Sequence, residues 1–597
     1  MQEQQVAALL DEPHHDGSDL YVVQRPSKLG DEAVVRLRLP RATSADRVVL
    51  RYERDGEPRN AEAFVDEETD TDIWWRASFP VANPISRYRW LLAGGDAGYA
   101  WVNALGQTSH EVADADDFVM TVAAWSGPDW HLGSVAYEIF PDRFASSGLD
   151  VTAPDWLVRR DWNDLPTGRG RPTPFELYGG DLRGIEQHLD HIQSLGANLI
   201  YLTPFFPAGS THRYDATTFA QVDPLLGGDA ALESLAGAAH ERGIRIVGDI
   251  TPNHTGDKHE WFQAALRGSE PERDFYYFDD SIPGGYESWL GHRSLPKLNW
   301  QSPELHERFA GVLRRYIDLG LDGWRVDVAN MTGRYRDVDL NRDVSTWMRA
   351  QVGDHLLIAE HGHDFRPDLA VRGWHGVMNY SGFMRPLWTW LLRDDPDPEQ
   401  QKQFWGIPVG VPQLDGPAVV AAMRRFRAGV PWEAALHSWN LLDSHDVARF
   451  RTIAGTPERH LVGIGLQMTT PGVPMLFAGD ELGLEGAWGE DARRTMPWGS
   501  EETWDRTFMA ELRALIALRR SSEALARGGI RYVHVSADAI AFLRETRTER
   551  LLVLAARASH APITTPFSSL ETLYGEDASN GILPADGPAF HTWRIHG

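Results

Sequence analysis

The stretch SPELHERFAGVLRRYIDLGLDGWRVDV, residues 302–328, has the pattern of a helix that leads into a buried strand. Ser302 is a suitable N-cap, and Pro303 fits the first helical position. Six apolar residues recur at helical spacing and form one stripe: Leu305, Phe309, Val312, Leu313, Tyr316 and Ile317. Gly320 ends the helix, and residues 323–328 then form a short strand. A helix followed directly by an apolar strand is the repeating unit of α/β domains.

The same alternation of strands and helices extends outward on both sides of this stretch. Eight short runs have the length and apolar character of buried strands, at residues 135–140, 197–206, 244–250, 323–328, 356–360, 376–380, 438–444 and 474–479. Helical patterns lie between them, for example at residues 184–196. Eight such units predict an α/β fold, a (β/α)8 barrel of the TIM type.

We expect the barrel to be one of three domains. Residues 1–125 contain short apolar runs separated by turns, which predicts an N-terminal antiparallel β-sandwich. The barrel takes residues 126–525, and residues 526–597 return to short strands and predict a C-terminal antiparallel β-domain. The connection after the third barrel strand, residues 254–300, is too long for an ordinary loop, so we expect a small inserted subdomain there.

Composition narrows the classes of partner and compartment. The 597 residues carry 58 basic and 85 acidic side chains, a net charge of −27, which disfavours nucleic acid and anionic membranes. There is no cysteine, so disulfides and thiol chemistry are excluded. Residues 1–19 lack the basic and hydrophobic regions of a signal peptide, and no apolar run approaches the roughly 18 residues of a membrane span. These features predict a cytoplasmic protein.

Polar side chains stand where four of the predicted strands end. They are Asp249, Asn253 and His254 after the third strand, Arg325 and Asp327 on the fourth, Glu360 on the fifth, and His445 and Asp446 after the seventh. The carboxyl ends of parallel barrel strands meet at one face, where catalytic groups are found. Arg325 and Asp327 are two residues apart on one strand, so Arg325 can lie against Asp327 and keep it ionised. One strand-end aspartate is more often a simple ion pair, but the ordered set favours a catalytic site.

These motifs resemble those of the α-amylase superfamily, glycoside hydrolase family 13, and most closely its cyclomaltodextrinase, neopullulanase and maltogenic amylase branch. The four signature regions correspond to residues 249–254, DITPNH, 323–330, GWRVDVAN, 358–360, IAE, and 441–446, LLDSHD. A fifth, LPKLN at 295–299, is close to the MPKLN of the branch. Supporting stretches are IFPDRF at 139–144, HRYD at 212–215 and GVPMLFAGDELGLEG at 472–486.

The resemblance implies a retaining hydrolase of α-1,4 and perhaps α-1,6 glucosidic bonds in short linear or cyclic malto-oligosaccharides. Asp327 is then the nucleophile, Glu360 the general acid and base, and Asp446 the third carboxylate. His254 and His445 are expected to hold hydroxyls of the sugar, with Arg325 beside the nucleophile and Tyr214 stacked on the sugar ring. Transglycosylation and exo-acting α-glucosidase activity on the same substrates stay open, and a non-catalytic glucan-binding protein is the alternative from another class.

Three positions depart from the branch pattern: Met331, His361 and Asp443. We expect them to line or flank the aglycone side of the cleft, and the long segment 365–413 to narrow it.

No cofactor is required. The branch often carries a structural calcium, but only Asp150 is acidic in the corresponding loop, and the nearby Asp181 cannot hold such an ion alone, so calcium is left open and not favoured. The resemblance also implies a homodimer through the N-terminal domain. Trp74 and Trp75 are expected in the sandwich core, with a sugar platform or an interface as alternatives.

Overall fold

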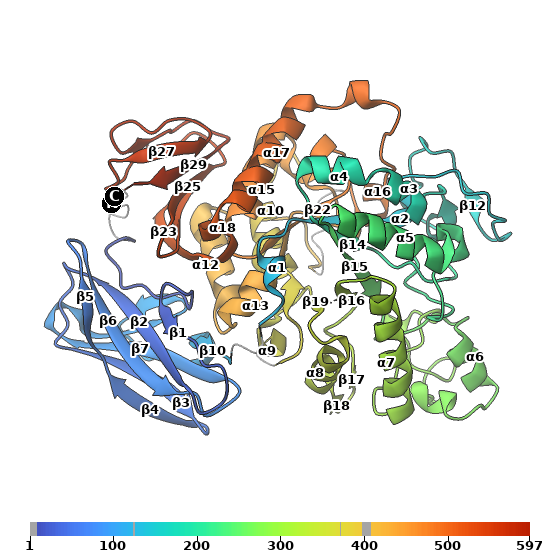
Figure 1. The fold of residues 1–597 in the computed structure, drawn as a ribbon, viewed down its shortest axis with the longest axis horizontal. Coiled ribbons are helices and arrows are strands. Elements are labelled where there is room, and N and C mark those ends of the chain that lie inside the picture. Colours follow the sequence, from blue (N-terminus) through green and yellow to red (C-terminus); the bar gives the residue numbers. More distant parts are fainter. Residues whose placement is uncertain (1–8, 123–125, 370–371, 397–406, 597) are drawn as a thin grey trace.

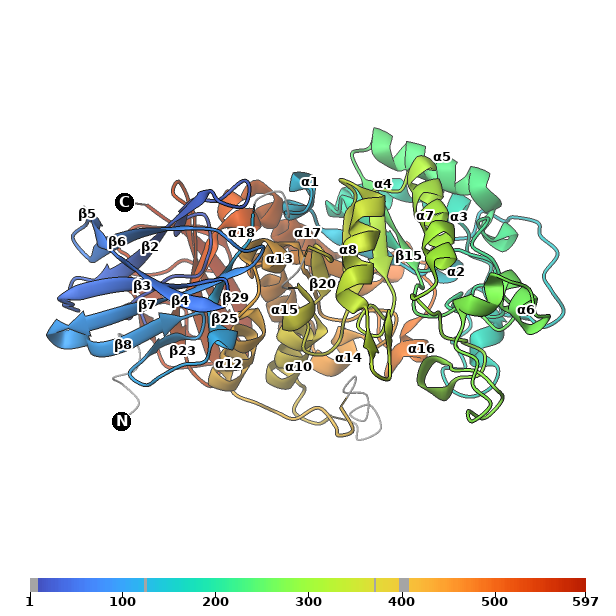
Figure 2. The same cartoon turned by 90° about the horizontal axis from the view of Figure 1, so that it is seen from below.

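The computed structural model describes residues 9–122, 126–369, 372–396 and 407–596. A parallel β-barrel with its helices forms one side of the molecule, and two β-domains lie together on the other side (Figure 1). The view from below shows the N-terminal sandwich stacked beside the C-terminal sheet (Figure 2). No helix among these residues is long and apolar enough to cross a membrane.

Eight parallel strands close the barrel, which confirms the predicted fold class. In order around the barrel they are β11 (Ala136–Ile139), β14 (Leu199–Leu202), β15 (Arg245–Ile250), β16 (Gly323–Val326), β19 (Leu356–Glu360), β20 (Gly376–Met378), β21 (Trp439–Leu441) and β22 (Val473–Phe477). Apart from Arg245, every residue of these strands is buried, because helices cover the barrel outside and side chains fill it inside. Each predicted strand overlaps one of them, although the strand predicted at 438–444 ends at Leu441 and the one predicted at 474–479 begins at Val473.

Helices surround the barrel as the alternation predicts. The helix read at residue 302 is α7 (Pro303–Asp318), with Ser302 at its N-cap position and Gly320 in the left-handed region at a φ of 110°. The longer helices around it are α5 (Gly228–Glu241), α8 (Asn341–Val352), α12 (Gly416–Arg427), α15 (Pro457–Thr469) and α17 (Arg506–Ser521). The helix expected over 184–196 is divided into α3 (Leu182–Gln187) and α4 (Leu189–Leu195) at His188, whose backbone leaves the helical region and whose ring binds the Gly184 carbonyl at 2.8 Å.

Shorter helices complete the barrel and its connections. They are α1 (Asp129–Leu132), α2 (Pro141–Phe144), α6 (Glu260–Leu266), α9 (Arg366–Leu369), α10 (Arg385–Leu391), α13 (Trp432–His437), α14 (Phe450–Ala454), α16 (Gly489–Ala492) and α18 (Glu523–Arg527). The connection between β15 and α7 holds α6 and few other regular elements, and a bridge between His254 and Lys297 ties its two ends together. This is where an inserted subdomain is predicted.

Two sheets form the N-terminal sandwich. One has the order β1-β2-β6-β5, and the other β4-β3-β7-β8-β9 with β10 beside β7. Their bounds are β1 (Val22–Gln24), β2 (Glu32–Pro40), β3 (Arg47–Arg54), β4 (Glu57–Glu62), β5 (Phe64–Glu68), β6 (Asp72–Pro80), β7 (Ser86–Gly94), β8 (Gly98–Asn103), β9 (Gly106–Thr108) and β10 (Phe118–Met120). Trp75 packs on the core between the sheets, whereas Trp74 faces the other way and is covered by Tyr21 and the guanidinium groups of Arg36 and Arg38.

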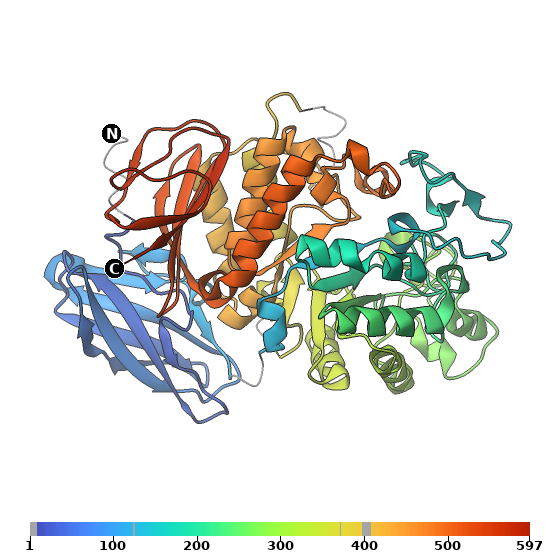
Figure 3. The ribbon, with the colours of Figure 1, turned by 45° about the horizontal axis from the view of Figure 1, so that its top comes forward.

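The C-terminal sheet has the order β23-β24-β25-β29-β27. Its strands are β23 (Gly529–Val535), β24 (Ala539–Glu545), β25 (Arg550–Ala556), β27 (Leu570–Tyr574) and β29 (Ala589–Ile595), with β26 (Ile563–Thr564) paired to β28 (Ile582–Leu583) beside them. Figure 3 shows this sheet, in red, next to the orange helices α15 and α17 of the barrel.

Candidate active site

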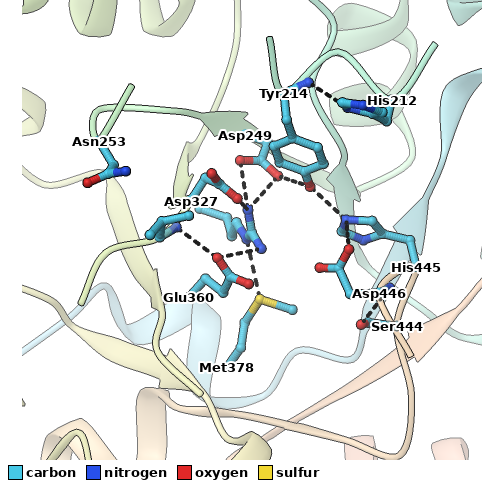
Figure 4. Close-up of polar contacts among 12 residues, drawn as sticks. His212, Tyr214, Asp249, Asn253, Asp327, Glu360, Met378, Ser444, His445 and Asp446 are labelled. Carbon is cyan, nitrogen blue, oxygen red and sulfur yellow. Dashed lines mark hydrogen bonds and ion pairs between the residues drawn. The ribbon is translucent and has the colours of Figure 1, made fainter. Parts of the chain in front are cut away.

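The predicted site residues meet at the carboxyl ends of the barrel strands. Glu360 is the last residue of β19, Asp327 directly follows β16, and Asp446 lies in the loop after β21. Figure 4 shows these three carboxylates directed toward one central space, with Tyr214 and His445 on its rim. Parallel strands end at the same face of a barrel, so residues far apart in the sequence become neighbours there.

Arg325 lies at the centre of this arrangement and contacts several of its acids. Its side chain is completely buried, and Nη1 lies 2.8 Å from Asp327 Oδ1 and 3.0 Å from Asp249 Oδ2. Its Nη2 lies 3.3 Å from Glu360 Oε2, and Nε donates to the Met378 sulfur at 3.4 Å. One guanidinium therefore holds the predicted nucleophile and the predicted acid against each other, and the contact expected between Arg325 and Asp327 is present.

The charge balance differs from the simple expectation that Arg325 keeps Asp327 ionised. Burial and the neighbouring Glu360 carboxylate raise the pKa of Asp327, and Arg325 opposes this shift only in part. Burial also raises the pKa of Asp249 to about 6. Two buried carboxyl groups that share one cation favour a state in which only one of them is protonated. A protonated acid beside an ionised nucleophile is such a state.

The residue after the nucleophile has an unusual backbone. Val328 has a φ of 45°, in the left-handed region that β-branched residues avoid. In this conformation its N–H donates to Glu360 Oε2 at 2.7 Å, and the next N–H, of Ala329, donates to the Glu360 carbonyl at 3.1 Å. The turn therefore joins the ends of β16 and β19 and orients Glu360. Spacing along the sequence carried no sign of this role.

On the other side of the site, His445 connects Asp446 to Tyr214. His445 Nε2 lies 2.7 Å from the Tyr214 hydroxyl and 3.2 Å from Asp446 Oδ1, and its ring stacks on Tyr214 with centroids 5.6 Å apart. Arg493 Nη2 lies 3.3 Å from Asp446 Oδ1. The Asp446 side chain is 24% exposed, against 7% for Asp327 and 10% for Glu360, so it has the most open surface of the three.

His254 lies on the wall formed by the connection after β15. It is 2% exposed, and burial lowers its pKa to about 3, so the ring is neutral. Its Nδ1 contacts the Asn253 amide at 3.2 Å, and Lys297 Nζ donates to Asn253 Oδ1 at 2.6 Å. Among the described residues His254 Nε2 is buried with no hydrogen-bond partner of ordinary geometry, and the backbone of Tyr214 partly offsets the effect of burial on the ring.

Two of the three residues that depart from the branch pattern are buried and contact other protein groups. His361 is 3% exposed, and its Nε2 lies 3.0 Å from Asp368 Oδ2. Asp443 is 1% exposed and accepts the Phe450 N–H at 2.6 Å, so it lies beneath the site and not on its wall. Met331 is half-buried. In the segment 365–413, residues 370–371 and 397–406 lie outside the described residues.

The loop considered for a structural calcium, residues 145–150, and the nearby Asp181 have few oxygen atoms free for such an ion. Asp181 Oδ1 accepts the Gly184 N–H at 2.8 Å, and Oδ2 accepts the Ser147 N–H at 2.8 Å. Asp150 is exposed. Among the residues that the structure describes, no three histidine or acidic side chains converge in a way that could hold a metal. These side chains do not fit a cation that needs about six to eight oxygen ligands.

Comparison with known proteins agrees with this geometry. Residues 138–368 match the family model of the alpha amylase catalytic domain. Neopullulanase 2 of Thermoactinomyces vulgaris is 30% identical over 552 residues, with 88% of each chain covered. A cyclomaltodextrinase of a Bacillus species is 31% identical over 450 residues, which cover 73% of this chain and 75% of that one.

A solved structure is similar over most of the chain as well. The cyclic α-maltosyl-(1→6)-maltose hydrolase of Arthrobacter globiformis, in complex with that sugar, superposes with a TM-score of 0.65 at 30% identity, covering 79% of this chain and 100% of the other. The catalytic barrel, the site at its carboxyl face and the similarity to relatives across most of their length lead to one conclusion. The chain belongs to the α-amylase family of glycoside hydrolases, in its cyclomaltodextrinase, neopullulanase and maltogenic amylase branch.

Proposed function

We propose that Asp327, Glu360 and Asp446 carry out retaining hydrolysis of α-1,4 and α-1,6 glucosidic bonds in short linear or cyclic malto-oligosaccharides. The observation that supports this most strongly is that Arg325 contacts both Asp327, at 2.8 Å, and Glu360, at 3.3 Å. Retaining glycosidases place a nucleophile and an acid about 5–5.5 Å apart, and two carboxylates on one guanidinium suit that spacing.

The roles follow from position and exposure. Glu360 donates a proton to the leaving glycosidic oxygen while Asp327 attacks the anomeric carbon, which forms a covalent glycosyl-enzyme. Glu360, now ionised, takes a proton from water as the water displaces Asp327. Asp446, the most exposed of the three, binds sugar hydroxyls together with His254. His445, which was expected to bind them as well, has a buried ring and acts through Asp446, 3.2 Å from its Nε2. Tyr214 offers one face of its ring to the sugar and stacks on His445 with the other.

The named relatives support short and cyclic substrates. A neopullulanase and a cyclomaltodextrinase are similar to this chain over most of their length, and the similar solved structure is a hydrolase of a cyclic maltosyl-maltose. We therefore expect cyclic maltodextrins and cyclic maltosyl-maltose to be cleaved faster than starch. Separation of the products by size and linkage tests this, and it also distinguishes hydrolysis from transglycosylation and from exo-acting glucosidase action.

Azide rescue tests the roles of the two central carboxylates. With an aryl α-glucoside and sodium azide, Glu360→Gln is expected to yield the α-glucosyl azide, because the glycosyl-enzyme still forms and azide then displaces Asp327. Asp327→Gly is expected to yield the β-glucosyl azide, because azide replaces the missing nucleophile. The opposite pair of products, or full turnover by Asp327→Gly without azide, would refute the assignment.

For the assembly we propose a homodimer that forms through the N-terminal sandwich. Phe64 is 58% and Val65 43% exposed, on the edge strand β5 of that domain. An exposed apolar edge strand is a natural pairing surface. Sedimentation velocity is expected to show a dimer that becomes monomeric in the double variant Phe64→Asp, Val65→Lys, while Leu165→Asp, at 62% exposure on the barrel, leaves it unchanged. A monomeric unmodified protein would contradict the proposal.

We also propose that the enzyme needs no cofactor or metal and works in the cytoplasm. Dialysis against EDTA is then expected to leave both activity and thermal midpoint unchanged, because Asp181 already has protein donors on both oxygens. Loss of activity that calcium restores would reject the metal-free proposal. Cell fractionation tests the compartment.

A further inference from the structure

Glu138 is a buried acid beneath the active site that the reaction scheme does not use. It lies in β11 inside the barrel and is 0% exposed. Its Oε1 makes a short hydrogen bond with His445 Nδ1, and Oε2 has no hydrogen-bond partner among the described residues. A buried carboxylate oxygen without a partner is costly, and such groups in native proteins usually serve a function.

The hydrogen bonds around His445 determine where its protons lie. The Tyr214 hydroxyl donates its single proton to Asp249 Oδ2 at 3.0 Å. Its contact with His445 Nε2, at 2.7 Å, therefore needs the proton on the nitrogen. The other nitrogen, Nδ1, faces the Glu138 carboxylate, which accepts. With both nitrogens donating, the ring is an imidazolium.

On balance, the charged groups around the His445 ring favour the imidazolium. Burial acts against a charged His445, but the carboxylates of Asp446 and Glu138 outweigh it and raise the pKa of the ring. Arg493, which donates to the His445 carbonyl at 2.8 Å, opposes them. Asp249 lies one hydrogen bond beyond, through Tyr214.

The remaining neighbours complete the surroundings of His445. His212 is held neutral, because burial lowers its pKa to about 3, and Phe140 covers the ring with centroids 6.2 Å apart. In return, the His445 charge offsets the effect of burial on Asp446, whose pKa is lowered.

We propose that Glu138 is a positioning residue that holds His445 as an imidazolium and, through it, keeps Asp446 ionised and in place for the sugar. The proposal rests on the proposed function of the site. Glu138 does not touch the substrate: its carboxylate lies on the inner side of the His445 ring, and Asp446 lies on the outer side.

NMR of histidine ring nitrogens in the substrate-free enzyme tests the charge directly. The His445 signal is identified by its loss in His445→Asn. In the unmodified protein we expect an imidazolium signal at pH 7, where an ordinary histidine is mostly neutral. In Glu138→Gln we expect the neutral ring at pH 7, because the amide can donate to Nδ1.

Glu481→Gln is the matched control, since Glu481 is equally buried in the barrel but binds His191 and Tyr137. It should leave the His445 signal unchanged. A neutral His445 in the unmodified protein at pH 7 overturns the proposal, whether or not Glu138→Gln folds.

Kinetics give the second readout. Glu138→Gln is expected to lower kcat/KM by about 10- to 100-fold, the size of loss that follows removal of a carboxylate that orients a metal-binding histidine. The acid limb of its pH profile should move to higher pH, because Asp446 loses the neighbouring positive charge. An unshifted profile with lower stability alone would mean that Glu138 is only structural. If the unmodified enzyme cleaved no α-glucan, the proposed function would fail, while the NMR result would still decide the charge of His445.

Discussion

At the scale of single residues, the site combines more negative charge than its cations neutralise. Asp249, Asp327 and Glu360 all contact Arg325, whose side chain has no exposed surface. Burial favours the neutral form of such acids, so their ionisation at neutral pH lowers the stability of the fold. A catalytic site that keeps an ionised nucleophile out of water carries this cost as part of its function.

Asp327→Asn is therefore expected to abolish activity and to stabilise the protein. We expect kcat to fall by about 10⁴-fold or more, as for other nucleophiles. The raised pKa of Asp327 means that the folded protein holds its proton to higher pH than the unfolded chain does. Ionised Asp327 therefore lowers the free energy of unfolding fully when the pH is above its pKa in the folded protein. The effect is absent below its pKa in the unfolded chain, near 3.8.

Thermal unfolding at two pH values measures this effect. The variant should gain about 1 kcal/mol or more at pH 8, and the gain should vanish near pH 3.5. Asp322→Asn is the control: Asp322 is buried, precedes β16 at the end of the barrel opposite the site, and is paired with Arg245 at 2.7 Å, so its loss should lower stability and leave kcat unchanged. A destabilised Asp327→Asn would contradict the expected charge penalty.

At the scale of elements, the turns after the strands decide how the site is held. The end of β16 binds β19 through Val328, and the loop before α8 binds α9 through Arg334, which lies 2.7 Å from Asp368 Oδ1. Asp368 also holds His361, the residue after Glu360, at 3.0 Å. Two loops that carry the nucleophile and the acid are thus fastened by side chains behind the site.

Val328 offers a test of backbone strain. Glycine is ordinarily about 0.5–1 kcal/mol less stable than alanine in a regular element. At a φ of 45° the order should reverse, so that Val328→Gly is more stable than Val328→Ala by about 1 kcal/mol. The control pair is Val326→Gly and Val326→Ala, at the last residue of the buried strand β16, where alanine should be the more stable. Urea denaturation of the four variants measures these differences. If alanine were more stable than glycine at both positions, the backbone at Val328 would not be strained.

Asp368→Asn tests the connection between the two loops. Removal of one partner from a buried ion pair should reduce the free energy of unfolding by about 3 kcal/mol at pH 7. Hydrogen bonds from His361 and Arg334 overcome burial and lower the pKa of Asp368, so its contribution exists above the unfolded value, near 3.8, and disappears as the pH falls through the folded pKa. The gap between variant and unmodified protein should therefore narrow in acid.

Asp364→Asn is a control within the same segment. Asp364 pairs with Arg366 at 2.8 Å, but its side chain is 49% exposed, so the change should stay within about 0.5 kcal/mol. Equal losses in the two variants, measured by urea titration at pH 7, would show that burial of the Asp368 pair does not matter.

At the scale of the whole molecule, buried arginines join the C-terminal sheet to the barrel. Arg544 of β24 is 0% exposed, and it donates to the carbonyls of Gly528, at 2.7 Å, Gly529, at 3.1 Å, and Leu525, at 3.2 Å. It also donates to Thr469 at the end of α15. A guanidinium can satisfy several carbonyls at once, which no apolar residue can do.

Arg544→Met is therefore expected to weaken the junction of the two domains. Several buried carbonyls would lose their donor, at about 1–3 kcal/mol for each group left unsatisfied. Calorimetry should show the single transition splitting in two, and proteolysis should begin between residues 522 and 530. Arg550→Met, on the same sheet but 32% exposed, should change neither. An unsplit transition in Arg544→Met would show that the domains are held by other contacts.

The fold and the three predicted carboxylates could be read from the sequence because their signals are local. A buried strand must be short and apolar, a helix must repeat its apolar face, and an acid at a strand end reaches the same face as the others whichever helices intervene. Residues 302–328 already contain one complete unit, with Arg325 and Asp327 at the end of its strand. The contact of Arg325 with Asp327, at 2.8 Å, follows from their spacing on that strand.

Only the tertiary structure decided which buried groups are joined by hydrogen bonds. It also decided which of the residues that depart from the branch pattern lie in the protein interior. Glu138 and His445 are 307 positions apart, and nothing in the pattern around VAYEIF distinguishes an acid that binds a histidine from one that caps a strand. His361 and Asp443 were expected to line or flank the cleft, and only the structure shows that both are buried, with Asp368 and the Phe450 N–H as their partners. The partner of a buried polar side chain is set by packing between distant segments, and that information is not local in the chain.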